Sequence, residues 1–165
     1  MGRNVEIGPG IDPFFLRNPS RDKWILIENW DLPLGQLHAN YDNHSSVEAI
    51  LSGGFEKALP TLEDSSIVRI VMIDVLGFNQ SVAWVGTIQI GYSPYLMNLL
   101  ASESARVLKR RGHLIIAEIQ TPPPKDLIIP YFQKAGLRLT EDTNNVGSYT
   151  NTVPFPNQYL LEFKK

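Results

Sequence analysis

The chain has 165 residues, of which 43% are hydrophobic and 19% charged, the composition of a globular protein rather than a disordered one. It has no cysteine, which excludes disulfides, a thiol nucleophile and cysteine metal sites. The formal net charge of -2 gives no overall signal for nucleic acid or an anionic membrane, although it is compatible with a local basic patch. No apolar run has the length of a membrane span and the N-terminus lacks a signal-peptide pattern, so we expect one cytoplasmic domain over residues 1–165.

The first strand runs directly into a glycine turn, Val5-Glu6-Ile7-Gly8-Pro9-Gly10. Gly8 and Gly10 allow a tight turn and the close approach of a ligand, because neither carries a Cβ atom. Asp12-Pro13 predicts a short helix over residues 13–17, with Asp12 as its cap and Pro13 in the first position. A strand, a glycine turn and a helix start in succession predict a nucleotide-type pocket.

Strands and helices alternate along the rest of the chain. The patterns predict strands at 23–28, 47–51, 67–74, 113–119, 137–140 and 159–163, and helices at 34–41, 94–111 and 126–135. Residues 87–90 fit either a short strand or part of a loop. The alternation predicts a parallel sheet with helices on both faces, and the two final strands predict an antiparallel hairpin at its edge.

The helix beginning at Pro94 is the clearest one in the sequence. Its apolar stripe is expected to comprise Leu96, Leu99, Leu100 and Val107, with Met97 and Leu108 beside them. Lys109, Arg110 and Arg111 are expected in its last turn, where positive charge complements the helix dipole, and Gly112 after them as the stop. A phosphate-binding patch is the alternative interpretation of these three cations.

Five pieces of sequence resemble the class I S-adenosylmethionine-dependent methyltransferases, in the same order along the chain. They are the stretch at 5–10, Glu28 at the end of the second strand, Gly53-Gly54-Phe55-Glu56 after the third, the segment from Leu59 to Ser65 with Ile70 to Asp74, and Arg106-Val107-Leu108-Lys109-Arg110-Arg111-Gly112. The resemblance implies a doubly wound α/β fold with a mostly parallel seven-stranded sheet and an antiparallel C-terminal hairpin. It also implies S-adenosylmethionine as the cofactor and methyl transfer as the reaction.

The resemblance also implies a set of cofactor-binding residues, comprising Glu6, Gly8, Pro9, Gly10, Glu28, Asn29, Gly54, Phe55 and Asp74. Glu28 would accept hydrogen bonds from both ribose hydroxyls. Glu6 would orient the first loop, or else bond backbone amides as a structural residue. Asp74 would assist cofactor binding or accept a proton from the substrate, and the alternative is that it caps the following turn. Trp30, Phe55 and Tyr92 are aromatic candidates for the adenine or the cation, or else core residues.

The sequence departs from the family pattern at three points. Asp12 stands where the family has its third glycine, and Gly54 stands where it has an aspartate that contacts adenine, so Glu56 or a backbone amide would take over that contact. Only four residues precede the first strand, which suggests a minimal domain lacking an N-terminal cap, or one cut from a larger protein. Substrate contacts are then expected from 78–92 and 144–158.

Two other functions remain as alternatives. The first is a non-catalytic binding module with the same fold, acting within a larger polypeptide or with a protein partner. The second, a nicotinamide-dependent oxidoreductase, is disfavoured by Pro13 at a position where the dinucleotide fingerprint requires glycine. The acceptor is not indicated, although Asp74-Val75-Leu76-Gly77 differs from the Asn/Asp-Pro-Pro-Tyr/Phe of methylases acting on base or glutamine amino groups. The histidines show no metal spacing, and His113 is expected to be structural.

Overall fold

The computed structural model describes residues 2–17, 21–73, 75–76, 94–118, 123–146 and 158–165. Its strands are β1 (Arg3–Ile7), β2 (Lys23–Glu28), β3 (Val47–Ser52), β4 (Ile67–Ile73), β5 (Leu108–Glu118), β6 (Arg138–Thr143) and β7 (Tyr159–Lys164). Its helices are α1 (Phe14–Arg17), α2 (Asp31–Tyr41), α3 (Phe55–Ala58), the 3-10 turn η1 (Leu59–Thr61), α5 (Pro94–Val107) and α6 (Lys125–Lys134). Among these residues, no helix combines the length and the apolar character that crossing a bilayer requires.

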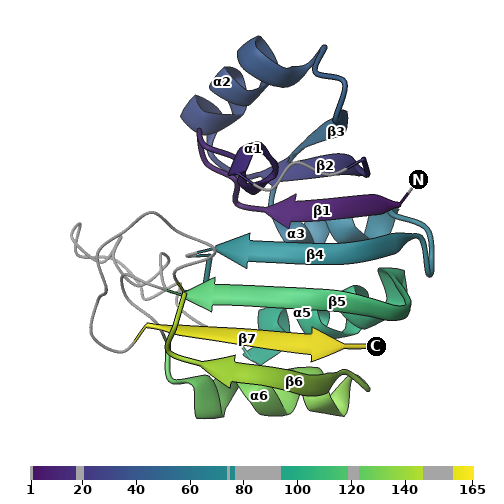
Figure 1. Cartoon of the computed structure of the whole chain (residues 1–165), viewed down its shortest axis with the longest axis vertical. Helices are drawn as coiled ribbons and strands as arrows, with labels where there is room; N and C mark the ends of the chain where they lie inside the picture. Colours follow the sequence, from purple (N-terminus) through teal and green to yellow (C-terminus); the bar gives the residue numbers. More distant parts are fainter. Residues whose placement is uncertain (1, 18–20, 74, 77–93, 119–122, 147–157) are drawn as a thin grey trace.

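The strands form one seven-stranded sheet in the order β3-β2-β1-β4-β5-β7-β6 (Figure 1). β1 to β5 run parallel to one another, and β7 runs antiparallel to both of its neighbours. The predicted fold class is therefore confirmed, including the antiparallel hairpin. β7 is inserted between β5 and β6, which places β6 at the edge of the sheet.

Both faces of the sheet are packed, because alternate residues of each strand point to opposite sides. One core joins Val5, Ile70, Leu114 and Phe163 of the strands to side chains from α3, η1, α5 and α6. The other core joins strand residues of the opposite parity to α1 and α2, and comprises Phe14, Phe15, Trp24, Leu26, Leu37, Val71, Ile115, Val146 and Leu160. The inner parallel strands β1, β2, β4 and β5 are thus buried on two sides, as their nearly continuous apolar sequences predict, whereas β3 at the edge has no fully buried residue.

Helix α5 differs from the sequence prediction in its buried face. The residues it buries are Met97, Leu100, Ala101, Ser104 and Val107, which follow the spacing of one helical stripe. Leu96 and Leu99 are only half-buried and flank this stripe. Because Leu at 96 and 99 fits the same period, the sequence could not distinguish the centre of the stripe from its edge.

The larger correction concerns the end of α5, which is Val107 rather than Arg111. Leu108 already pairs with Ile67 of β4, and His113 pairs with Arg69. One residue of β4 therefore lies opposite four residues of β5, from Lys109 to Gly112, which form a bulge. The prediction that Lys109, Arg110 and Arg111 belong to the helix was wrong. Pairing with the neighbouring strand overrides the helical propensity of these residues.

Candidate functional site

The parallel strands bring the predicted site residues to one edge of the sheet. β2 and β3 lie on one side of β1, and β4 and β5 lie on its other side, so the strand order reverses between β1 and β4. In doubly wound sheets, ligands bind outside the carboxyl ends of the strands at this point. These ends lie on the left in Figure 1. The candidate site is therefore the crevice formed by the loops that follow β1, β2, β3 and β4.

The turn after β1 has the conformation that its glycines predict. Gly8 and Gly10 have φ angles of +69° and +58°, in the left-handed region that side chains disfavour. A Cβ atom on Gly8 would lie 2.9 Å from Val75 Cγ2, in the segment that follows β4. Gly8 itself is exposed, whereas Pro9 behind it is buried. The turn therefore offers bare backbone to the crevice while resting on the loop after β4.

Glu28, the last residue of β2, connects the turn after β1 to the loop after β2. Its Oε2 accepts a hydrogen bond from the Gly10 N–H at 3.0 Å, and its Oε1 accepts from the N–H groups of Asn29 at 2.9 Å and Trp30 at 3.0 Å. Only 6% of the residue is exposed, so Glu28 is a buried carboxylate and not a solvated acid. A carboxylate offers about four acceptor positions, which leaves capacity for a further donor on Oε2.

Glu6 performs a structural task in the same region. Both of its carboxyl oxygens lie within hydrogen-bond distance of the Phe14 N–H, at 2.7 and 2.9 Å. Glu6 therefore accepts the N–H of the first residue of α1. Burial raises the pKa of Glu6 to about 8, although hydrogen bonds from the Phe14 and Phe15 amides and the charge of Arg17 act in the opposite direction. The structure thus favours the second role predicted for Glu6, that of a group bonding backbone amides.

Asp12 lies outside this contact. Its side chain is 66% exposed and its Oδ2 lies 3.7 Å from Arg17 Nη2. As a helix cap, Asp12 would accept the Phe14 N–H, but this N–H donates to Glu6 instead. Asp12 therefore lies at the surface beside a cation, and its charge contributes to the raised pKa of Glu6.

The loop after β3 places the Glu56 carboxylate beside Gly54. Gly54 is the residue that precedes α3, in extended conformation. A Cβ atom built on Gly54 would meet Glu56 Oε2 at 2.0 Å, so the Glu56 carboxylate occupies the space where a side chain at 54 would begin. Phe55 is half-buried against the core. Asn29 is exposed and contributes its backbone N–H to Glu28, while Trp30 beside it is 44% exposed.

A third buried acid, Glu118 at the end of β5, was not singled out from the sequence. It is fully buried, and its Oε1 accepts the N–H of Leu76 at 2.8 Å, which fixes the loop after β4. The sequence did contain an indication of this role, because an acid ends β5 just as Glu28 ends β2. Asp74 and Tyr92, which the sequence predicts near this place, lie outside the described residues.

The histidines make local contacts. His113 Nδ1 pairs with the Glu162 carboxylate on β7, which agrees with the structural role expected for it. His38 Nδ1 of α2 lies 2.8 Å from Oδ1 of Asp42, the residue that follows the helix, and His44 Nδ1 accepts the Ser46 N–H. Within the described part of the chain, no three His, Asp or Glu residues are grouped as a metal site would require.

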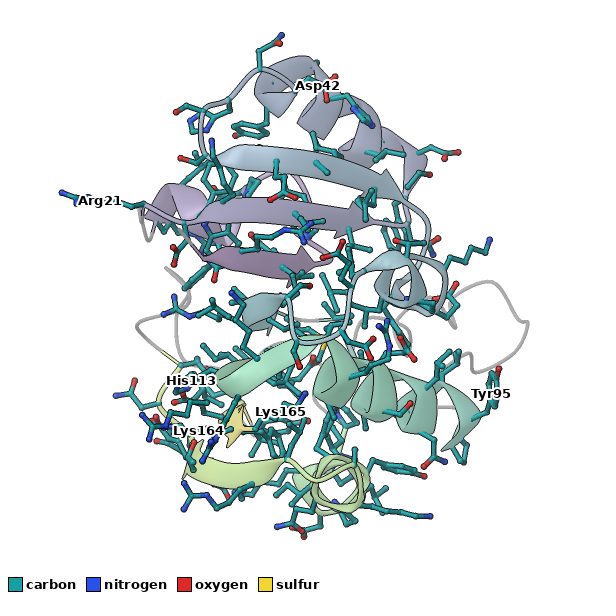
Figure 2. The ribbon with its side chains drawn as sticks, turned by 90° about the vertical axis from the view of Figure 1, so that its right-hand side faces the viewer. Arg21, Asp42, Tyr95, His113, Lys164 and Lys165 are labelled. Carbon is teal, nitrogen blue, oxygen red and sulfur yellow. The ribbon has the colours of Figure 1, made fainter. Side chains whose placement is uncertain are left out.

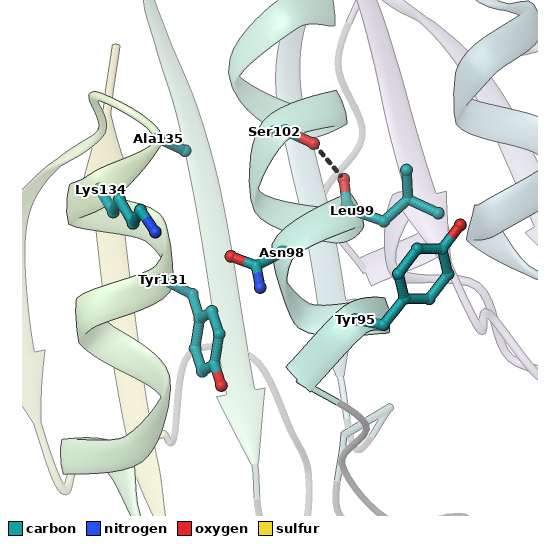
Figure 3. A pocket seen from close by; sticks show the side chains of 7 residues that line it. All are labelled: Tyr95, Asn98, Leu99, Ser102, Tyr131, Lys134 and Ala135. Carbon is teal, nitrogen blue, oxygen red and sulfur yellow. Dashed lines mark hydrogen bonds between the residues drawn. The ribbon is translucent and has the colours of Figure 1, made fainter.

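A groove of about 390 Å³ lies away from these loops, between α5 and α6 (Figure 3). Its lining comprises Tyr95, Asn98, Leu99, Ser102, Tyr131, Lys134 and Ala135. None of the residues predicted to bind the cofactor contributes to it. Its Asn98 amide donates to the Pro94 carbonyl and its Ser102 hydroxyl to the Leu99 carbonyl, so both polar groups are satisfied within α5.

Comparison with solved structures identifies the fold, whereas no family model and no curated protein matches the sequence. A TehB-like S-adenosylmethionine-dependent methyltransferase from Corynebacterium glutamicum is similar with a TM-score of 0.70 at 14% identity, over 99% of this chain and 80% of that one. Aeropyrum pernix fibrillarin, solved with natively bound S-adenosyl-L-methionine, gives 0.65 at 12% identity, over 98% and 66%.

A third similar structure is a methyltransferase from Haloferax volcanii, described as putative and solved in complex with the Trm112 methyltransferase activator. It gives a TM-score of 0.65 at 14% identity, over 99% of this chain and 82% of that one. The strand order, the antiparallel β5-β7-β6 arrangement and these neighbours agree. The chain therefore has the fold of the class I S-adenosylmethionine-dependent methyltransferases.

Proposed function

We propose that the protein binds S-adenosylmethionine in the crevice at the carboxyl ends of β1 to β4 and transfers its methyl group to an acceptor. The observation that supports this proposal best is Glu28, a buried carboxylate directed at the turn that contains Gly8 and Gly10. When bound, the cofactor supplies an electrophilic methyl group on its sulfonium, so the protein mainly has to position two partners and exclude water.

The residues of the crevice suit the parts of this cofactor. The free acceptor capacity of Glu28 suits the ribose hydroxyls, and the turn from Gly8 to Gly10 suits close approach of the methionine portion to the backbone. The Glu56 carboxylate over Gly54 suits the adenine amino group, in place of an acid at position 54. We propose Asp74, after β4, as the residue nearest the acceptor, and the cytoplasm as the site of action.

Calorimetric titration tests the proposal. We expect the protein to bind S-adenosylmethionine and S-adenosylhomocysteine, and Glu28→Ala to weaken both by about 1–3 kcal/mol, because charge-assisted and partly buried hydrogen bonds are lost. Since Glu28 also holds Gly10, Asn29 and Trp30, circular dichroism and urea unfolding must show that the variant remains folded.

Glu63→Ala is the matched control, because Glu63 is an exposed acid that precedes β4 and therefore lies at the opposite end of the sheet. We expect its affinities to equal those of the unmodified protein. Equal affinity in folded Glu28→Ala would remove Glu28 from the cofactor site, and the absence of heat with either ligand would remove the enzymatic proposal.

A second candidate function, a non-catalytic binding module of the same fold, is favoured by one specific observation. Three backbone N–H groups donate to the Glu28 carboxylate, which links the loops after β1 and β2 as a purely structural residue would. Such a module would act with a partner protein or as part of a larger polypeptide. It would be the surviving candidate if the unmodified protein bound neither cofactor form.

A further inference from the structure

The bulge from Lys109 to Gly112 presents three consecutive cations at the end of the sheet where the parallel strands begin. Lys109, Arg110 and Arg111 are all exposed, and Arg111 adopts a φ of 67°, which is rare for a residue with a side chain. A backbone held in this region costs on the order of 1–3 kcal/mol and persists only where the surrounding structure imposes it. The conformation of the bulge is therefore held in place by contacts with the surrounding structure.

Lys165 is what imposes it. The Arg111 N–H donates to the Lys165 carbonyl at 3.0 Å, and the Lys165 N–H donates to the Gly112 carbonyl at 3.0 Å. The Lys165 ammonium donates to the carbonyls of Leu108 at 2.7 Å and Arg106 at 3.3 Å. The Lys165 ammonium thus satisfies carbonyl groups at the carboxyl end of α5. The sequence predicts instead that Lys109, Arg110 and Arg111 supply the positive charge there. That task no longer accounts for these three cations.

Three further cations continue the bulge across the sheet. Arg69 of β4 pairs in register with His113 of β5, His113 with Lys164 of β7, and Lys164 with Arg138 of β6. Residues in register point to the same side of a sheet, and four neighbouring strands span roughly 14 Å at their usual spacing. Figure 2 shows His113, Lys164 and Lys165 together, at the end of the molecule opposite the crevice.

These six cations, which we call the basic patch, are Arg69, Lys109, Arg110, Arg111, Arg138 and Lys164. Within the described residues none of them forms an ion pair, whereas Arg3, Arg17, Arg106 and Lys125 each do. Glu162 and Glu141 pair in register two pairs further along, and Glu162 is bonded to His113. Glu63 and Asp64, which precede β4, lie at the same end of the sheet, and Asp64 pairs with Arg106. Six of the 15 Lys and Arg residues of a chain with a net charge of -2 are thus gathered at this end of the sheet, and none of the six is in an ion pair within the described residues.

We propose that the basic patch binds the sugar–phosphate backbone of a nucleic-acid duplex. Gathered cations that release the counterions of phosphates are the usual footprint of such binding. A membrane surface fits less well, because the large exposed apolar side chains lie outside the patch: Ile11, Leu16, Trp30, Leu32, Tyr95 and Leu127. A single strand also fits less well. Proteins that bind single strands use exposed aromatic side chains, whereas the ring that lies in register between Arg69 and Lys164 is the half-buried His113.

The patch and the crevice lie at opposite ends of the same strands. A duplex held at the patch would therefore anchor the protein without entering the crevice. This inference is independent of methyl transfer, and it holds or fails whether or not the crevice binds a cofactor.

Fluorescence anisotropy with a short labelled duplex, in DNA and RNA versions of one sequence, tests the inference. We expect binding to at least one version, with an affinity that falls steeply between about 50 and 200 mM salt. The double variant Lys109→Gln/Arg110→Gln should weaken binding at least about tenfold at low salt and reduce the salt slope by about two, one for each cation removed. Within the described residues, neither side chain forms an ion pair, and circular dichroism checks that the variant is folded.

Arg21→Gln/Lys57→Gln is the matched control, since it removes the same charge from exposed positions outside the patch. We expect it to leave the affinity and the salt slope nearly unchanged. Equal weakening by both double variants would mean that only net charge matters, and would overturn the inference. Failure of the unmodified protein to bind either duplex, or binding to phosphatidylserine vesicles in preference to the duplexes, would also overturn it.

Discussion

At the scale of single residues, the crevice contains two buried glutamates with different surroundings. Glu28 receives three N–H groups, whereas Glu6 is more deeply buried, at 3% exposed, and the N–H groups directed at it are those of Phe14 and Phe15. Desolvation therefore dominates at Glu6 and raises its pKa from 4.5 to about 8. Glu6 keeps a proton in the folded state at a pH where the unfolded chain has lost it.

This difference predicts how stability depends on pH. Since the folded state binds one more proton than the unfolded chain, protonation of Glu6 stabilises the folded state. This stabilisation is fully present below pH 4.5 and is lost as the pH rises through about 8. At 1.36 kcal/mol for each pH unit, the whole interval corresponds to on the order of 5 kcal/mol. We expect Glu6→Gln, which stays neutral, to match the unmodified protein near pH 4.5 and to become progressively more stable than it towards pH 8.

Urea unfolding followed by tryptophan fluorescence measures this difference, because Trp24 packs against Phe14 beside the Glu6 contact. Glu63→Gln serves as the control, since Glu63 is exposed and should show no such divergence. Parallel stability curves for Glu6→Gln and the unmodified protein would show that Glu6 ionises normally in the folded state.

At the scale of secondary-structure elements, Arg106 fastens the end of α5 to the segment between η1 and β4. Its guanidinium donates to the carbonyls of Leu62 at 2.8 Å and Leu59 at 2.9 Å, and it pairs with the carboxylates of Glu103 and Asp64. Hydrogen bonds to Glu103 and then to Asp64 raise the pKa of Arg106 further. The planar fork of an arginine can reach several acceptors at once, which an ammonium cannot.

We therefore expect Arg106→Lys to lower the free energy of unfolding by about 2 kcal/mol, despite the conserved charge. Arg110→Lys is the control, because Arg110 is exposed in the bulge and should change stability by less than about 0.5 kcal/mol. Urea denaturation of the three proteins measures both effects. An Arg106→Lys variant as stable as the control would show that the contacts to η1 contribute little.

The elements themselves were largely predictable, and the exceptions have a physical reason. β2 was predicted with its observed bounds, because a continuous apolar run closed by Glu28 fits only a buried strand at that length. The bulge after Val107 was not predictable, because Leu-Lys-Arg-Arg favours a helix locally. What decides its conformation is Lys165, a residue 54 positions beyond Arg111 in the sequence and adjacent to it in the sheet.

The site was predictable to a different extent. Gly8, Gly10 and Glu28 meet because parallel strands end at the same edge, which the order of elements alone implies. The role of Glu6 was left open, since the sequence does not state whether a carboxylate will be buried. The position of the Glu56 carboxylate over Gly54 depends on a side-chain conformation, which no pattern of residues specifies.

At the scale of the whole molecule, ligand binding should appear as added stability. If the crevice binds S-adenosylhomocysteine, a concentration about 100 times its Kd adds about 2.7 kcal/mol to the folded state. For a chain of this length, that should raise Tm by about 5–10 °C. Differential scanning fluorimetry measures the shift, which should be smaller for Glu28→Ala at the same ligand concentration. An equal shift in both proteins would place the ligand elsewhere.

The insertion of β7 between β5 and β6 has a consequence for synthesis on the ribosome. Within the described residues, the last strand in sequence is the partner that joins β6 to the rest of the sheet. A nascent chain that has not yet released residues 159–164 thus carries two open strand edges, those of β5 and β6, and such edges readily pair with other chains. The half of the sheet containing β1 to β4 can assemble early, whereas the other half must wait until β7 has left the ribosome.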